Sequence, residues 1–365
     1  MRSPLMDEAL ELARQGLGRT SPNPAVGAVL VKGGEIVGRG FHTYSGAKHA
    51  EVLALEEAGE TARGSTLYIT LEPCSHQGRT PPCADALIRA GVAQVIAAMQ
   101  DPNPQVAGQG FRRLHEAGIA VEIASEYSEE AARLNEAFIH SMQTGLPLVT
   151  LKAALTLDGK ISAPEDNTGW ITSERARAHV QQIRHNADAI LTGIGTVLAD
   201  DCLLTDRTGL ERSRPLLRIV ADSTLRMPVD SRMLVSADHD LAVITTSAAS
   251  VERRQALENR GVRVLVFDGP GGRADLTKLP AFLAGEQYRS LMIESGSKLN
   301  WAVLESRIVD KIFFYYAPKI LGGLLSLPVA GGAGRLRRTD AIQFKNVRLH
   351  SIPPDEFVVE AWVRK

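Results

Sequence analysis

The chain has 365 residues, of which 44% are hydrophobic and 23% charged, with a formal net charge of −1. This composition excludes a disordered or collagen-like chain, and at about 150 residues per domain the length predicts two or three domains. The near-zero charge gives no overall attraction to nucleic acid or anionic membranes. Three cysteines make a poor disulfide framework. The sequence contains neither a run of 18 apolar residues nor an apolar leader. We therefore expect a soluble cytoplasmic protein.

The first part of the chain predicts a hairpin followed by alternating strands and helices. Apolar spacing predicts a helix over residues 6–16, which Ser21-Pro22-Asn23-Pro24 separates from the next element. The hairpin spans 25–31 and 35–41 and turns at Gly33-Gly34. Further elements are helices at 49–58, 84–90, 111–117 and 128–143 and strands at 66–71, 92–99 and 119–124. This alternation predicts a sheet rich in parallel strands and covered by helices.

Gly145-Leu146-Pro147 ends the last of these helices and predicts a boundary between domains at 1–145 and 146–365. The second domain alternates again. Its expected strands are 148–155, 188–193, 216–221, 241–245, 262–267 and 289–293, and its expected helices are 173–185, 250–260, 276–284 and 298–305. The last strands, 310–317, 341–350 and 356–363, have no helices between them and are expected to be antiparallel. Stretches 268–273 and 328–334, rich in Gly and Pro, predict exposed loops.

One set of residues predicts a catalytic zinc site. His49-Ala50-Glu51 stands where a helix is expected to start, Pro73-Cys74 follows a strand, and Cys83 opens the next helix. An imidazole and two thiolates would leave the fourth zinc position for water, and Glu51 would lie beside that water and carry its proton to a leaving amine. Alone, such a histidine is usually on the surface and a cysteine usually in the core. Together they match the His-x-Glu and Pro-Cys-x-x-Cys signature of zinc deaminases.

The spacing between the two cysteines departs from that signature. The usual two intervening residues are replaced by eight, 75–82, which include His76 and Arg79. Two interpretations have equal weight from spacing alone: a loop that binds an anionic group such as a phosphate ester, or a solvated insertion.

A weaker signal lies in the second domain, where the strand ending at Thr192 runs into Gly193-Ile194-Gly195-Thr196. Glycines there allow a phosphate to approach the backbone closely. Only two glycines fit the dinucleotide fingerprint, so the residues by themselves favour a tight turn.

Longer motifs carry a family resemblance along essentially the whole chain. They are 70–76 and 78–83 around the cysteines, Asp101-Pro102-Asn103-Pro104, and, in the second half, 155–160, 170–172, 197–201 and 317–323. These stretches resemble the bifunctional deaminase–reductase family of riboflavin biosynthesis. The resemblance implies a cytidine-deaminase-like α/β sandwich followed by a dihydrofolate-reductase-like α/β domain, and self-association into a homo-oligomer.

The resemblance also implies two reactions. The first half would hydrolytically deaminate 2,5-diamino-6-ribosylamino-4(3H)-pyrimidinone 5′-phosphate with Zn²⁺, and the second would reduce the ribosyl chain to ribityl with NADPH. His49, Cys74 and Cys83 would bind zinc, Glu51 would shuttle the proton, and Asn23, His42, His76 and Arg79 would contact this substrate. The implied cofactor positions are Ala154, Trp170, Thr196, Asp200, Ser223, Gly296, Ser297, Lys298, Leu299, Asn300, Trp301 and Ala302, and the implied substrate positions are Lys152, Thr168, Arg184, Leu204, Arg207 and Glu294.

Several positions have simpler interpretations, or depart from the family pattern. Asn23 could form a turn before Pro24, Arg184 could be a charge at a helix C-terminus, and Trp170 could be a core or lid aromatic. Thr168 stands where the family more often has Ser, and Lys298 lies in a run that differs from the family's and could alter cofactor preference.

Two other classes of protein remain as alternatives. A nucleic-acid or nucleoside base deaminase with an unrelated C-terminal domain would share the metal site. The charge of −1 and an aromatic content of 5% disfavour the basic, aromatic-lined channel that nucleic acid requires. A non-catalytic, zinc-stabilised module is disfavoured because structural zinc sites normally have four protein ligands and would not need Glu51.

Overall fold

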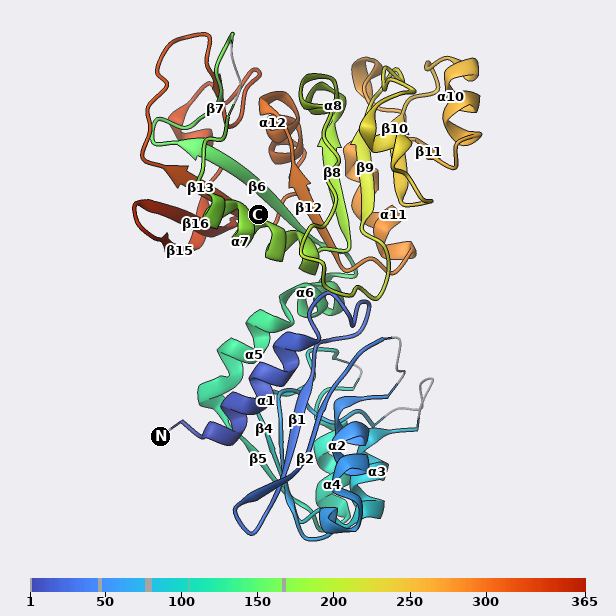
Figure 1. Ribbon diagram of the computed structural model, residues 1–365, viewed down its shortest axis with the longest axis vertical. Helices are drawn as coiled ribbons and strands as arrows, with labels where there is room; N and C mark the ends of the chain where they lie inside the picture. The colour runs from blue at the N-terminus through green and yellow to red at the C-terminus, as the bar shows by residue number, and fades with distance from the viewer. Residues whose placement is uncertain (1, 45–47, 76–80, 105, 166–168) are drawn as a thin grey trace. The chain divides into compact units, whose positions relative to one another are not determined.

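The computed structural model describes residues 2–44, 48–75, 81–104, 106–165 and 169–365 (Figure 1). The chain divides into two compact units, one formed by Met1–Leu146 with Glu211–Arg214 and the other by Pro147–Leu210 with Pro215–Lys365. The division falls just after Gly145, which ends the preceding helix with a φ of 73°. A glycine adopts this left-handed conformation at little cost, and Pro147 then cannot continue a helix.

The first unit is built on a mixed sheet with helices on both faces (Figure 1). Among the described residues the sheet has five strands in the order β2-β1-β3-β4-β5, in which β1 is antiparallel to β2 and β3 while β3, β4 and β5 are parallel. The strands are β1 (Gly27–Lys32), β2 (Glu35–Phe41), β3 (Thr66–Ile69), β4 (Gln94–Ala97) and β5 (Ala120–Ile123). Helices α2 (Ala50–Ala58), α3 (Cys83–Ala90) and α4 (Gln109–Glu116) pack on one face, and α1 (Pro4–Gln15) and α5 (Ser128–Leu134) on the other.

Two glycines let α2 lie unusually close to β2. A Cβ atom at Gly38 would stand 2.1 Å from the Ala54 carbonyl oxygen, and one at Gly40 would stand 2.1 Å from that of Ala50. Any side chain at either position would therefore push the helix off the strand. The close packing places the start of α2, and His49 directly before it, at one end of the sheet.

The prediction of one continuous helix over 128–143 is wrong. Helix α5 ends at Leu134, and α6 (Glu136–Thr144) follows after Asn135, whose φ of −110° and ψ of 21° are not helical. The buried Asn135 amide accepts a hydrogen bond from the Ala25 backbone N–H at 2.7 Å and donates one to the Ala25 carbonyl at 2.9 Å. This pairing satisfies a buried backbone segment that has no strand partner of its own, and it interrupts the helix.

The second unit contains a nine-stranded sheet within the described residues, in the order β11-β10-β9-β8-β12-β6-β13-β16-β15. The strands from β11 to β13 are parallel, whereas β16 is antiparallel to both β13 and β15. This confirms the expectation that the last three strands are antiparallel to one another. The strands are β6 (Leu148–Thr156), β8 (Ala189–Gly193), β9 (Leu217–Ala221), β10 (Leu241–Thr245), β11 (Arg263–Val266), β12 (Ser290–Glu294), β13 (Lys311–Ala317), β15 (Phe344–Ile352) and β16 (Glu356–Val363).

Helices cover both faces of this sheet as well (Figure 1). One face packs against α7 (Glu174–Asn186), α8 (Ile194–Asp200), α9 (Arg232–Val235) and α10 (Val251–Glu258), and the other against α11 (Leu279–Gly285) and α12 (Ser297–Glu305). Short 3-10 turns occur at Gly59–Ala62, Ser125–Tyr127, Pro270–Gly272, Leu276–Lys278 and Arg338–Asp340. The predicted helix at 276–284 therefore begins as a 3-10 turn before α11.

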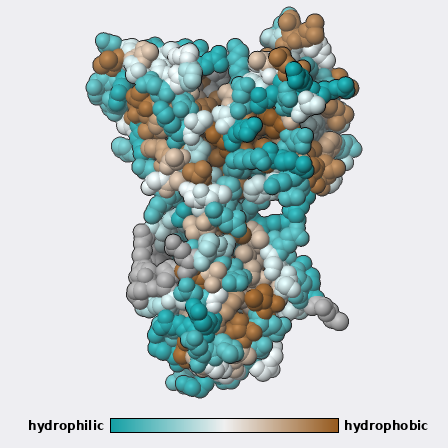
Figure 2. Space-filling model, turned by 180° about the vertical axis from the view of Figure 1, so that it is seen from behind, coloured by the Kyte–Doolittle hydropathy of each residue, from teal (hydrophilic) through white to brown (hydrophobic). Residues whose placement is uncertain are grey.

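A small two-stranded sheet was not expected from the sequence. Strand β14 (Leu327–Pro328) pairs with β7 (Lys160–Ser162), so the start of the expected 328–334 loop belongs to a strand. On the visible face of the molecule, hydrophobic residues are interspersed among hydrophilic ones (Figure 2). None of the described helices combines the length and the apolar character needed to cross a bilayer.

Candidate functional sites

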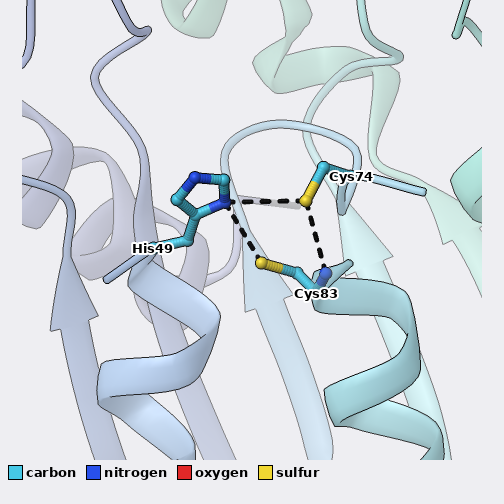
Figure 3. Close-up of side chains that lie close together, drawn as sticks. All are labelled: His49, Cys74 and Cys83. Carbon is cyan, nitrogen blue, oxygen red and sulfur yellow. Dashed lines mark hydrogen bonds between the residues drawn. The ribbon is translucent and has the colours of Figure 1, made fainter. Parts of the chain in front are cut away.

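The side chains of His49, Cys74 and Cys83 point toward one another at the ends of three elements (Figure 3). His49 directly precedes α2, Cys83 is the first residue of α3, and Cys74 lies in the segment that follows β3. The His49 Nδ1 atom is 3.2 Å from Cys83 Sγ and 3.6 Å from Cys74 Sγ, and the Cys83 backbone N–H points at Cys74 Sγ from 3.3 Å. Their three ligand atoms all lie within 4.8 Å of one another.

This arrangement fits a tetrahedral zinc ion. With zinc bonds of about 2.1 Å to nitrogen and 2.3 Å to sulfur, nitrogen and sulfur ligands lie about 3.6 Å apart. The pKa of the Cys74 thiol is lowered, because the Cys83 thiol, the His49 ring and the backbone N–H at the start of α3 all interact with its sulfur. Cys74 therefore favours the thiolate form that binds a metal, whereas the hydrogen bond to Cys74, burial and the neighbouring Glu51 raise the pKa of the Cys83 thiol.

Glu51 lies beside this cluster but is not one of its three members. Its side chain is buried, and it hydrogen-bonds the Cys83 thiol. Burial, together with the nearby Cys74 sulfur, raises the pKa of Glu51 to about 7. A carboxyl group with such a pKa can both accept and donate a proton near neutral pH.

Asn23 and His42 meet next to His49. The Asn23 Nδ2 atom donates to His42 Nε2 at 3.0 Å, and His42 Nδ1 donates to the Lys48 carbonyl at 2.9 Å. The rings of His42 and His49 are in edge contact with centroids 5.1 Å apart. Because burial lowers the pKa of His42, this ring favours its neutral form. The predicted substrate residues His76 and Arg79 lie outside the described residues.

The second unit has a candidate site where the parallel strands end. The chain leaves β6 toward β8 on one side of the sheet, and β12 later inserts between them, so the strand order reverses there. Ligands of such sheets bind in the crevice at this reversal, beyond the carboxyl ends of the strands. Glu294, the last residue of β12, bonds Arg184 of α7 through Nε at 3.0 Å and Nη2 at 2.7 Å, and Lys152 of β6 at 3.2 Å.

The three charged groups are largely buried, with side-chain exposures of 12% for Glu294, 14% for Lys152 and 8% for Arg184. Burial by itself would raise the pKa of Glu294, but the two cations lower it below its ordinary value. The Arg184 guanidinium also donates to the Thr205 carbonyl at 2.8 Å. Arg184 therefore links Glu294 to the loop that contains Thr205.

The positions expected to contact the nucleotide surround the same strand ends, but not all of them present a side chain. Thr196 and Gly296, near the starts of α8 and α12, are neighbours: a Cβ at Gly296 would lie 3.7 Å from Thr196 Oγ1. Ser297 and Asn300 are buried, and their side chains donate to the carbonyls of Pro328 and Val329 at 2.5 and 2.7 Å. The Ser223 hydroxyl accepts from the Ala274 backbone N–H at 3.0 Å.

The remaining expected positions differ in exposure. Ala154, Leu299, Trp301 and Ala302 are half-buried, whereas Asp200 and Lys298 are exposed. Trp170 is 67% exposed, and the Arg177 guanidinium lies 4.8 Å from its ring centroid. Leu204 is buried and Arg207 exposed on the loop after α8, and Thr168 lies outside the described residues.

Comparison with known proteins agrees with both halves of this description. The model of the RibD C-terminal domain matches residues 147–355, and that of the cytidine and deoxycytidylate deaminase zinc-binding region matches residues 2–99. The chain is 44% identical over 362 residues to the riboflavin biosynthesis protein RibD of Escherichia coli strain K12, covering 96% of each chain. It is 43% identical over 340 residues to that of Actinobacillus pleuropneumoniae, covering 93% of this chain and 90% of the relative. The chain belongs to the RibD family.

Solved structures of the RibD family share the whole fold. Acinetobacter baumannii RibD has a TM-score of 0.85 at 36% identity, covering 99% of this chain and 98% of that one. A Thermotoga maritima protein described as a diaminohydroxyphosphoribosylaminopyrimidine deaminase/5-amino-6-(5-phosphoribosylamino)uracil reductase has a TM-score of 0.83 at 34% identity with the same coverage. The predicted pair of α/β folds and the predicted bifunctional deaminase–reductase enzyme are confirmed. The alternative with an unrelated C-terminal domain is not supported, since that half is a RibD C-terminal domain.

Glu72, which lies within the 70–76 motif, has a structural role that the sequence did not predict. This buried carboxylate accepts backbone N–H groups from Asp101 at 3.0 Å, Gly108 at 2.9 Å, Gly110 at 2.8 Å and Phe111 at 3.3 Å. It thereby caps the start of α4 and ties the preceding loop to the segment that carries Cys74. One indication of this role is present in the sequence, a glutamate two residues before the candidate ligand Cys74. Its hydrogen-bond partners could not be inferred from the local sequence, because they lie 29–39 residues away.

Replacing Glu72 should destabilise the deaminase unit. In Glu72→Gln an NH₂ group faces buried N–H donors that need an acceptor, so we expect a loss of about 2 kcal/mol in unfolding free energy. Urea denaturation of the full chain measures this loss. Glu116→Gln, at an exposed position near the end of α4, is the matched control and should change stability by less than about 0.5 kcal/mol. Equal stability of the two variants would contradict the role of Glu72.

Proposed function

We propose that this RibD-family chain carries out two reactions on one substrate. Residues 1–145 deaminate 2,5-diamino-6-ribosylamino-4(3H)-pyrimidinone 5′-phosphate to the aminouracil with Zn²⁺, and residues 146–365 reduce its ribosyl chain to ribityl with NADPH. The observation that carries the proposal is the cluster of His49, Cys74 and Cys83 with the buried Glu51 beside it. The family membership of both halves supports it further.

In the deaminase half, Zn²⁺ held by His49, Cys74 and Cys83 would supply Lewis-acid activation of the attacking water. Glu51 takes one proton from this water and delivers it to the amino nitrogen, which leaves as ammonia. The ring carbon keeps the water oxygen as an oxo group, and the second water proton ends on the neighbouring ring nitrogen. A carboxyl group with a raised pKa suits both transfers. Asn23 and His42, which are hydrogen-bonded beside His49, hold the pyrimidine, with His76 and Arg79 as further substrate contacts.

In the reductase half, the reaction chiefly requires positioning. NADPH bound there would supply a hydride for C1′ of the open-chain imine, so the site must hold these two groups at close range. Glycines at 195 and 296 put no side chain at two positions by the starts of α8 and α12, and this surface fits a dinucleotide phosphate. The cofactor site is completed by Ala154, Trp170, Thr196, Asp200, Ser223 and the segment 296–302. Lys152, Thr168, Arg184, Leu204, Arg207 and Glu294 form the substrate site.

The proposed partners are small molecules and a second copy of the chain. A run of exposed apolar side chains in the segment after β13 supports self-association into a homo-oligomer. These are Ile320, Leu321, Leu324, Leu325 and Leu327, with Leu324 fully exposed. We place the protein in the cytoplasm, where thiols remain reduced and free to bind zinc.

The test of the proposed function uses the purified full-length protein loaded with zinc. It should release one ammonia per diaminopyrimidine ribose phosphate and then oxidise one NADPH per aminouracil formed. Coupled assays for ammonia and for absorbance of NADPH follow the two steps separately. Zinc-replete protein that releases no ammonia would overturn the deaminase assignment, and protein that deaminates without consuming NADPH would overturn the reductase assignment.

A further inference from the structure

The loop after α8 is held in a conformation that its own sequence does not favour. Leu204 has a φ of 51°, in the left-handed region that branched side chains rarely occupy. Such a conformation persists only when surrounding contacts impose it, and it is concentrated at functional sites. The same loop carries Arg207, an exposed cation three residues further on.

Contacts that hold this loop come from the last two turns of α7 and from β9, where Arg218 Nη1 donates to the Leu203 carbonyl at 3.1 Å. Three consecutive loop residues are each bound by one helix residue. The Thr205 carbonyl accepts from Arg184 Nη1 at 2.8 Å, the Asp206 carboxylate bonds His185 Nδ1 at 2.7 Å, and the Arg207 backbone N–H donates to Gln181 Oε1 at 3.1 Å. Helix α7 therefore holds the loop by hydrogen bonds to its backbone and by one buried side-chain pair.

Of these contacts, the His185–Asp206 pair is buried, with side-chain exposures of 3% and 10%. The other Asp206 oxygen accepts from the Thr208 backbone N–H at 2.9 Å and from the Thr208 hydroxyl at 2.8 Å. Burial alone would raise the pKa of Asp206, but these bonds from Thr208 and His185 lower it to about 2. The carboxylate is thus ionised and only accepts hydrogen bonds, so His185 Nδ1 carries a hydrogen.

The same helix also connects the loop to Glu294. Arg184, next to His185 on α7, bonds both the loop at Thr205 and the carboxylate of Glu294. A shift of the loop would therefore also move Arg184 and its ion pair with Glu294. His185 bonds Asp206 of the loop, so we expect it to affect a ligand through the loop.

We propose that His185 and Asp206 are positioning residues that hold the loop from Leu204 to Arg207 in the shape that receives the phosphate of the ribosylaminopyrimidine substrate during reduction. This inference rests on the proposed function of the second domain. It concerns the loop's shape and adds no group to the chemistry of hydride transfer.

The test separates substrate binding from the other properties of the same molecule. His185→Ala should raise KM for the aminouracil ribose phosphate about tenfold, because a hydrogen bond to a charged group is lost, and should change kcat less than about threefold. The dissociation constant of ribose 5-phosphate, measured by calorimetry, should rise by a similar factor. His185→Asn, whose amide nitrogen can take the place of Nδ1, should restore both values.

Three internal controls accompany these variants. Ammonia release and NADPH affinity, measured by fluorescence, should stay within about twofold of the wild-type values, and Gln182→Ala at an exposed position of α7 should behave as wild type. Thr208→Val keeps the backbone N–H bond to Asp206 but removes the contacts of the hydroxyl with Asp206, with His185 Nδ1 and with the Leu210 backbone N–H. It should raise KM in the same direction, which covers the case that His185→Ala does not fold.

The outcomes are distinct. Unchanged KM and ribose 5-phosphate affinity in both His185→Ala and Thr208→Val would overturn the positioning role. So would a loss of NADPH affinity or of ammonia release in parallel with the KM change, since that would indicate a general structural role. Wild-type protein that deaminates but does not reduce would instead overturn the proposed reductase function, and the positioning role with it.

Discussion

Replacing Glu51 by Gln should lower the rate of ammonia release about 10²- to 10⁴-fold, because the amide cannot accept a proton from water or pass one to the leaving nitrogen. The side chain keeps its size, and Glu51 is not among the three residues whose donor atoms converge. Zinc content, measured by elemental analysis, should therefore remain at the wild-type level. Initial rates of ammonia release at saturating substrate measure the catalytic loss.

The reductase half provides the control for this variant. Oxidation of NADPH with preformed aminouracil ribose phosphate should be unchanged in Glu51→Gln, which shows that the chain is folded. Loss of zinc together with activity would mean that Glu51 is a metal ligand, and deamination within threefold of wild type would mean that another group moves the proton.

Replacing Glu294 by Gln should destabilise the second unit by about 3–5 kcal/mol, because Lys152 and Arg184 would remain buried without their common counter-charge. The sign of the pH dependence follows from the lowered pKa of Glu294. Its stabilisation is fully present above the unfolded-state pKa of about 4.3 and is lost as the pH falls toward the folded-state value. Thermal and urea unfolding at pH 7 and at pH 4 should therefore show a smaller difference between wild type and variant at the lower pH.

A surface ion pair supplies the comparison. Glu258 on α10 bonds Arg254 one turn earlier at 2.9 Å, and their side chains are 33% and 47% exposed. Glu258→Gln should change the free energy of unfolding by less than about 1 kcal/mol at either pH. A similar small loss in Glu294→Gln would show that water or an ion compensates the two cations.

Local sequence information was sufficient for most elements and for the candidate metal cluster. Alternation of apolar residues located nearly every strand, and the expected helix starts near His49 and Cys83 lie within one residue of the observed starts of α2 and α3. These features depend on neighbours a few residues apart, because strand and helix periods and helix ends are set locally. The candidate ligands could be recognised for the same reason: each stands at the end of an element that the local pattern defines.

The long-range partners of buried polar groups could not be predicted from the local sequence. Asn135 interrupts a helix because of Ala25, 110 residues away, and the side chains of Ser297 and Asn300 bond carbonyls 29–31 residues downstream. Glu72 and the His185–Asp206 pair belong to the same class. Periodicity reports which face of an element is buried, whereas a buried polar atom needs a particular partner, and only the folded chain decides which one comes within reach.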